Sequence, residues 1–298
     1  MAEAGEDFDF DVIGQWSEPV SFSVTQDATI AYANATNDDA TPHAAGEYAP
    51  PVYAVVPVFS IMAERTMSAV PDELIMRILH GEQDMRFHRP IVAGDELTCR
   101  AQVVGVHGRS SGVVVTTLLE TRDAAGELVN EQYFTGFFRG GVLEGGRGEE
   151  PPAHGIDPTQ TERPADAVVV QKFDDDQTFR YSEASGDLMP IHLDDDFAKA
   201  MGLPGIIIHG LCTMAFTSRA VIETACPEDP SRLKRLAVRF SSPAQPKHTI
   251  TTELWKVTPE PLGDGGTYVF ETTTDEGDFV IRDGLAEIAP ATSKRSNA

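Results

Sequence analysis

Two short segments of the sequence combine polar side chains with the apolar surroundings of a reactive site. The first, residues 185–194, reads SGDLMPIHLD, and its Gly186 and Pro190 predict a tight loop after a helix. Such a loop can turn Asp187 and His192 to one point, where a carboxylate and an imidazole form an acid–base pair. An aspartate that caps a turn above a packed histidine is the structural alternative, and spacing alone favours it.

The second segment, residues 205–213, reads GIIIHGLCT and leads into the longest apolar helical stretch, Leu211–Ala225. Glycine at position 210 lets a ligand approach the backbone closely. The unpaired N–H groups of a first helical turn, together with the helix dipole, stabilise developing negative charge. The pattern therefore predicts a backbone oxyanion hole. Taken alone, Gly210 is more often a plain residue at a helix start, and His209 a hydrogen-bonded structural histidine.

Composition limits the classes of function. The chain has 298 residues with 23 basic and 47 acidic side chains, a net charge of −24. That charge argues against nucleic acid or membrane as a main partner, since both need basic patches. The longest apolar runs are too short to span a bilayer, and the acidic N-terminus has no secretory signal pattern. We therefore expect a cytoplasmic protein.

We expect no cofactor and no metal site. The three cysteines form neither a CxxC motif nor a metal-binding pattern with histidine, and we expect free packing thiols: Cys99, Cys212 and Cys226.

Periodicity divides the chain into two similar halves in which helices precede strands. In the first half, helices are predicted at Asp27–Thr36 and Tyr53–Ser68, and strands at Met85–Phe87, Glu96–Val106, Gly112–Arg122 and Val129–Phe138. In the second half, helices are predicted at Phe179–Ser185, Phe197–Met201 and Leu211–Ala225, and strands at Leu233–Phe240, Thr249–Val257, Thr267–Thr274 and Phe279–Ile288. Residues 140–164 are rich in Gly, Pro and Glu and predict a linker between domains 1–139 and 165–298.

The halves match each other at nearly constant offsets. Residues 32–38 align with 181–187, and His43 with His192, at an offset of 149. Residues 87–90 align with 240–243 at an offset of 153. These matches indicate an internal duplication; chance similarity between two helix-to-loop transitions is the alternative.

The combined pattern resembles the MaoC-like hydratases, the (R)-specific enoyl-CoA hydratase family. The resemblance covers Phe179–Ile288 and includes SGDxxPxH, IxHGL and the FSSP of residues 240–243. In the first half, FHRP at 87–90 and AGDEL at 93–97 resemble the degenerate first repeat of two-domain members.

The resemblance implies an α+β double hotdog, in which each repeat wraps an antiparallel sheet around a long central helix. It implies reversible syn addition of water to a trans-2-enoyl thioester, which gives a (3R)-3-hydroxyacyl thioester. Asp187 and His192 match the catalytic pair that activates the water, and the N–H of Gly210 matches the oxyanion donor. His209 and Thr213 are further oxyanion or substrate-binding candidates.

The sequence also departs from the family pattern. Met189 replaces the usual loop asparagine, and Ala215 stands where some members carry a hydroxyl, for which Thr213 is a nearby substitute. The first half has Ala49-Pro50-Pro51 instead of His-Gly, so we expect it to be a shell that widens the acyl tunnel. Its Asp38 and His43 are then turn and packing residues.

A thioester of CoA or of acyl carrier protein is the expected partner, and a homodimer is left open. Four cations lie between positions 232 and 239 and are candidates for CoA phosphate contacts: Arg232, Lys234, Arg235 and Arg239. A solvated sheet edge is the other interpretation of these charges. Two other functions stay open, a hotdog thioesterase and a non-catalytic acyl-CoA-binding or scaffold subunit.

Overall fold

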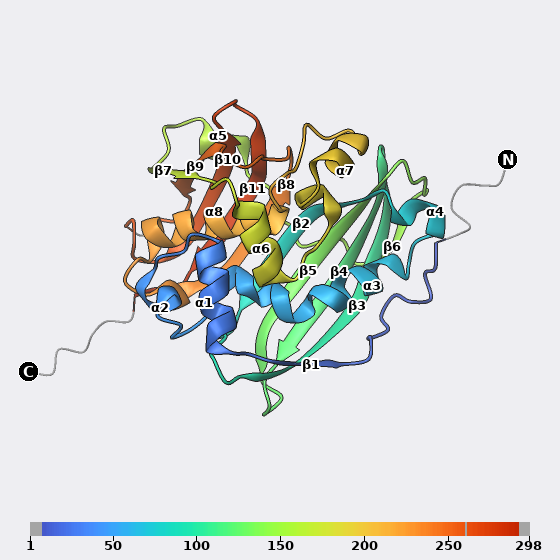
Figure 1. Ribbon diagram of the computed structural model, residues 1–298, viewed down its shortest axis with the longest axis horizontal. Coiled ribbons are helices and arrows are strands. Elements are labelled where there is room, and N and C mark those ends of the chain that lie inside the picture. The colour runs from blue at the N-terminus through green and yellow to red at the C-terminus, as the bar shows by residue number, and fades with distance from the viewer. Residues whose placement is uncertain (1–7, 260, 292–298) are drawn as a thin grey trace, which may run out of the picture.

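A computed structural model describes residues 8–259 and 261–291 of the chain (Figure 1). The first seven residues of the acidic N-terminus discussed above lie outside this range. No described helix has the length and apolarity needed to cross a membrane.

From residue 8 onward, the first half contains five strands and five helices. The strands are β1 (Val20–Ser23), β2 (Ile78–Phe87), β3 (Glu96–Arg109), β4 (Gly112–Arg122) and β5 (Leu128–Arg139). The helices are α1 (Gln26–Ala35), α2 (Thr41–Ala44), the 3₁₀ helix η1 (Pro51–Val58), α3 (Phe59–Met67) and α4 (Asp72–Ile75).

The second half repeats this plan after a connection that carries β6 (Gly146–Gly148) and α5 (Pro158–Thr161). Its strands are β7 (Ala167–Lys172), β8 (Leu233–Phe240), β9 (Thr249–Lys256), β10 (Gly266–Thr274) and β11 (Phe279–Ile288). Its helices are α6 (Gln177–Ser185), η2 (Pro190–His192), α7 (Asp195–Ala200), α8 (Gly210–Ala225) and η3 (Pro230–Arg232).

One continuous antiparallel sheet joins the halves. Its main path runs β1-β3-β4-β5-β2-β8-β11-β10-β9-β7, so the second half repeats the strand order of the first in reverse. At the junction of β2 with β8, Asp84 pairs with Ala237, and these positions are 153 apart. Matching residues of the two repeats thus face each other, as expected where a pseudo-twofold axis crosses an antiparallel pair.

The helices pack on the sheet and share one interior (Figure 1). The largest core cluster includes side chains of both halves, among them Tyr53 and Phe216. The hydroxyls of the buried Tyr32 and Tyr181, 149 positions apart, lie 3.2 Å from each other. The duplication and the double hotdog architecture expected from the sequence are both present.

Most predicted elements are confirmed within a few residues, and the main differences concern four elements. The edge strands β1 and β7 were not predicted. Strand β2 begins at Ile78 rather than at Met85, and the prediction missed this start because residues 80–84 are polar side chains and a glycine. The predicted helix Tyr53–Ser68 is split into η1 and α3, because Pro57 inside it disfavours a continuous α-helix.

The connection at 140–164 packs against both halves. Its strand β6 pairs with β3, and the buried His154 donates a hydrogen bond from Nδ1 to the Asp283 carbonyl over 2.6 Å. The three cysteines are free and buried, as expected; burial raises the pKa of the Cys99 thiol to about 11.

Candidate active site

The loop after α6 turns Asp187 and His192 toward the start of α8. Helix α6 ends at Gly186, whose φ of 79° lies in the left-handed region that favours glycine. Asp187 Oδ1 then accepts a hydrogen bond from the Met189 N–H over 3.2 Å, and η2 carries the chain to His192. The tight loop predicted from Gly186 and Pro190 is present.

A backbone carbonyl fixes the tautomer of His192. Its Nδ1 lies 2.7 Å from the Ile207 carbonyl, which can only accept, so Nδ1 carries the proton. The other ring nitrogen, Nε2, then keeps its lone pair. His192 is buried and presents one hydrogen-bond acceptor to the site.

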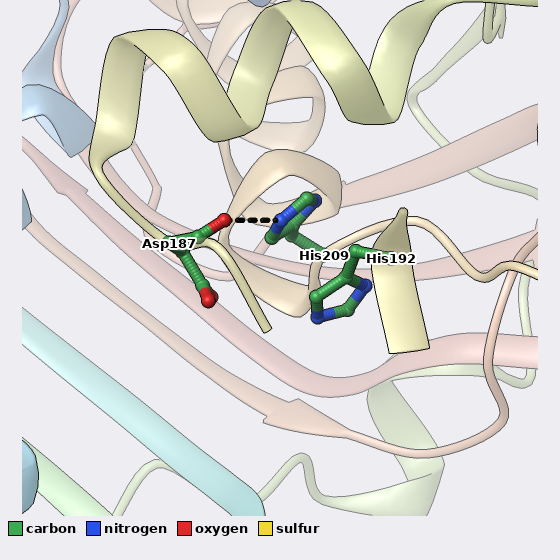
Figure 2. A group of neighbouring side chains, drawn as sticks. All are labelled: Asp187, His192 and His209. Carbon is green, nitrogen blue, oxygen red and sulfur yellow. Dashed lines mark hydrogen bonds between the residues drawn. The ribbon is translucent and has the colours of Figure 1, made fainter. Parts of the chain in front are cut away.

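His209 lies next to this pair, as Figure 2 shows. Its ring stacks on that of His192 with centroids 3.6 Å apart. Its Nε2 donates to the Asp187 carbonyl over 3.2 Å and also lies 3.2 Å from Ser182 Oγ. His209 therefore contacts both residues of the pair: it binds the backbone of Asp187 and stacks on the ring of His192.

Burial sets the protonation of the three groups. It raises the pKa of the Asp187 carboxyl and lowers that of His192, because both charged forms lose solvation. It lowers the pKa of His209 to about 3, and the neighbouring His192 adds to this shift. Both imidazoles are therefore neutral at pH 7.

The same three residues have the composition of a metal site, and one ligand atom of each lies within 4.8 Å of the others. However, His192 Nδ1 and His209 Nε2 both donate to carbonyl oxygens. A metal bound through His209 Nε2 would break the bond to Asp187. The arrangement suits proton transfer better than metal binding.

Helix α8 begins at Gly210, one residue after His209. A Cβ atom at position 210 would lie 3.2 Å from the ring of Phe240, tighter than nearly all such contacts. Glycine thus lets the first turn of α8 approach β8. The N–H groups of this turn have no partner within the helix and are available to an anionic oxygen.

A cavity of ≈ 530 Å³ opens at this point between the two halves. His192, Gly210 and Thr213 line it; Asp187 lies beside His192 but is not part of the wall. The apolar wall comes from both repeats and includes Ile78, Leu79, Val114 and Phe137 of the first and Ile191, Leu203, Ile207 and Phe240 of the second. A long apolar group fits such a wall.

The matching place in the first half is closed. Asp38 and His43 form a buried pair there, with 2.8 Å between Oδ2 and Nδ1. Helix η1 starts at Pro51, which has no N–H to donate, and the adjacent cavity measures only ≈ 30 Å³. The first half therefore lacks both the donor and the space that the second half has.

The four cations of η3 and β8 do not form a cluster at the cavity. Arg232 and Lys234 bind backbone carbonyls, and Arg235 is held by Asp84 and Glu287. Only Arg239 lines the cavity, and it pairs with Glu82 and Asp283. Strand β8 is central, so the sheet-edge interpretation of these charges is wrong.

Among the cavity residues that the sequence prediction did not name are two basic side chains. His80 and Arg139 come from β2 and β5 of the first half. The predicted strand began at Met85, so nothing in the pattern assigned a position to His80. Only the pairing of β2 with β8 brings it to the second repeat.

Comparisons with known proteins agree with this geometry. The family model of the MaoC like domain matches residues 157–276, and that of the MFE-2 hydratase 2 N-terminal domain matches residues 43–140. Together the two models account for both repeats.

Relatives match over most of the chain. The 3-hydroxyacyl-thioester dehydratase Y of Mycobacterium tuberculosis is 31% identical over 92% of this chain and 96% of its own. A probable enoyl-CoA hydratase 2 of Dictyostelium discoideum is 32% identical over 72% of this chain and 71% of its own. The mouse peroxisomal multifunctional enzyme type 2 is 32% identical, but the match spans only 32% of its length.

Solved structures give the same fold. A MaoC-like dehydratase from Phytophthora capsici superposes with a TM-score of 0.81 at 25% identity, covering 94% of this chain and 98% of that one. A Mycobacterium tuberculosis protein described as a double hotdog superposes with a TM-score of 0.59 at 15% identity, covering 97% and 99%. With two repeats and a double hotdog fold, this chain belongs to the MaoC-like family of hydro-lyases.

Proposed function

We propose that the chain catalyses the reversible hydration of a trans-2-enoyl thioester to a (3R)-3-hydroxyacyl thioester. The observation that carries this proposal is a neutral His192 with a free Nε2, next to Asp187 and the open first turn of α8. Relatives named as enoyl-CoA hydratase and 3-hydroxyacyl-thioester dehydratase support the substrate class.

In the proposed reaction, one water is held between Asp187 and His192. As its oxygen bonds to C3 of the substrate, His192 Nε2 accepts a proton, and electron density moves to the thioester oxygen. The Asp187–His192 pair then returns one proton to C2 on the same face. Water is thereby divided into the hydroxyl at C3 and the hydrogen at C2, and both side chains end as they began.

The start of α8 stabilises the enolate-like oxygen. The Gly210 N–H donates to it, and the positive end of the helix dipole adds to the effect. Thr213 lies one turn further and also lines the cavity. We assign it substrate contact, and we assign His209 the positioning of Asp187 and His192.

The first repeat acts as the shell for the acyl group. Its closed counterpart site and its apolar contribution to the large cavity support this role. At the outer part of the cavity, Arg239 is half exposed and is the β8 cation best placed for a CoA phosphate.

The test is hydration of crotonyl-CoA and of longer enoyl-CoAs, followed by the loss of the conjugated thioester absorbance. Removal of the general base, in His192→Gln, is expected to lower kcat by about 10²–10⁴; we expect a loss of the same order for Asp187→Asn. The matched control is Asp38→Asn, the equivalent position of the first repeat, which should retain activity. Absence of turnover by the wild type at every chain length would overturn the proposal, whereas activity in both second-repeat variants would refute the residue assignment.

A further inference from the structure

His80 is a histidine of the first repeat in the cavity of the second. It lies in β2, next to a register shift at Gly81, and lines the same ≈ 530 Å³ cavity as His192 and Gly210. Its ring packs between Phe134 and Phe240, with centroids 4.6 Å and 4.5 Å away. The mechanism above gives it no role.

A chain of hydrogen bonds fixes the tautomer of His80. The Ala54 carbonyl can only accept a hydrogen bond. The Gln132 side-chain atom 2.6 Å from it is therefore the donor, Nε2, which fixes the orientation of this amide. Gln132 Oε1 therefore accepts from Gln83 Nε2 over 3.0 Å, and Gln83 Oε1 is left to face His80 Nε2, also at 3.0 Å. His80 Nε2 must carry the proton, which makes Nδ1 the acceptor of the ring.

The His80 ring is neutral and borders the cavity. Burial lowers the pKa of His80 to about 4, so the ring is neutral at pH 7. Two aromatic rings, Gln83 and the backbone of Glu82 contact the side chain, and the half-buried residue lines the cavity.

Phe240 connects His80 to the oxyanion donor. The Phe240 ring that packs on His80 also packs on Gly210, where an added Cβ atom would lie 3.2 Å from the ring. His80 is therefore one aromatic ring away from the place where the thioester oxygen binds. Groups a few bonds from the thioester carbonyl can reach it.

We propose that His80 is a substrate-binding residue whose Nδ1 accepts a hydrogen bond from an N–H or O–H group of the bound thioester. This inference rests on the proposed function. Two sources can supply the donor: the pantetheine amide two carbons from the sulfur, or a hydroxyl on the acyl chain. A half-buried polar acceptor of this kind would favour substrates that carry such a donor over those that lack it.

The test compares ratios of kcat/KM in the wild type and in His80→Phe, which keeps an aromatic ring between the two phenylalanines. The probes are S-ethyl thiocrotonate, S-crotonyl-N-acetylcysteamine, which adds the amide, and S-ethyl 4-hydroxythiocrotonate, which adds an acyl hydroxyl. Loss of one hydrogen bond should lower the preference for one donor-bearing probe roughly three- to tenfold. The probe that responds identifies the source, and unchanged ratios for both would overturn the proposal.

General damage lowers the rates of all probes together and leaves the ratios unchanged. His88→Phe, at an exposed histidine just beyond β2 that does not line the cavity, is the matched control. If His80→Phe does not fold, His80→Leu removes the same nitrogen atoms with a smaller side chain. If the wild type shows no turnover, the same ratios are measured as Kd values of the saturated butanoyl analogues, so failure of the proposed function is distinguishable from failure of this one.

Discussion

Two adjacent histidines of the site are held in opposite tautomers. His192 donates from Nδ1 to Ile207, and His209 donates from Nε2 to Asp187. Both acceptors are backbone carbonyls, so neither ring can reverse its role without losing a hydrogen bond. The free Nε2 of His192 is therefore a property of the folded backbone.

The pH dependence of kcat/KM should report His192. A general base must be unprotonated, and burial lowers the pKa of His192 below its ordinary 6.5. Activity is therefore expected to be on its plateau at pH 7 and to fall in acid, with a midpoint below 6.5. The measurement is a pH profile with crotonyl-CoA; an acid limb that persists unchanged in the residual activity of His192→Gln would assign it to another group.

Methionine at position 189, where the family usually has asparagine, is expected to have little effect on kcat. Its side chain is 49% exposed, and its contact with Asp187 is made by the backbone N–H, which any residue keeps except proline. Met189→Asn should therefore change kcat by less than about threefold, well below the effect of losing a general base. A gain of tenfold or more in steady-state hydration would show that the amide takes part in the chemistry.

At the scale of single elements, the start of α8 makes the difference between the repeats. Gly210 gives the second repeat an open first turn, whereas Pro51 gives the first a 3₁₀ helix without the corresponding N–H. The neighbouring cavities differ accordingly, ≈ 530 against ≈ 30 Å³. One helix start thus separates a usable site from a filled one.

Gly210→Ala should displace this helix start from Phe240. The added Cβ would sit 3.2 Å from the ring, so either the ring or the first turn must shift by a few tenths of an ångström. We expect kcat to fall at least tenfold, and by about 10²–10³ where the displacement removes the oxyanion donor completely. Gly155→Ala is the control, since a Cβ there meets nothing within 4 Å.

Partial recovery of kcat in Gly210→Ala/Phe240→Leu would confirm the steric cause. Full activity of Gly210→Ala alone would contradict it. Stopped assays at saturating crotonyl-CoA separate this loss in kcat from a change in KM.

At the scale of the whole molecule, the β2–β8 junction holds the two repeats together. Arg235 of β8 binds Asp84 of β2 with contacts of 2.6–3.1 Å, and both side chains are largely buried. The junction also brings His80 to the cavity of the second repeat. Stability and site assembly therefore depend on the same pair of strands.

Asp84→Ala should destabilise the protein strongly. It leaves the guanidinium of Arg235 buried without its main partner, a change that typically costs about 3–5 kcal/mol of the free energy of unfolding. Urea unfolding at pH 7 measures it. The exposed pair Arg163–Asp166 provides the control, and Arg163→Ala should leave the urea midpoint nearly unchanged.

A small effect of Asp84→Ala would contradict the structural role of the pair. In the double variant Asp84→Leu/Arg235→Met, apolar packing replaces both charges, and most of the stability should return.

Sequence by itself determined the duplication, most strands and helices, and the positions of Asp187, His192 and Gly210, because these follow from short-range patterns. Periodicity reflects which face of an element is buried, and loop residues such as Gly186 act locally. The family membership followed from the same short motifs.

Only the tertiary structure decided which residues of the first repeat join the site of the second. The pairing of β2 with β8 places His80 in the cavity. It also pairs Arg235 with Asp84, although these two residues are 151 positions apart in the chain. The tautomers of His192 and His80 depend on carbonyls of Ile207 and Ala54. Such contacts form only when distant segments pack, so no local pattern of residues records them.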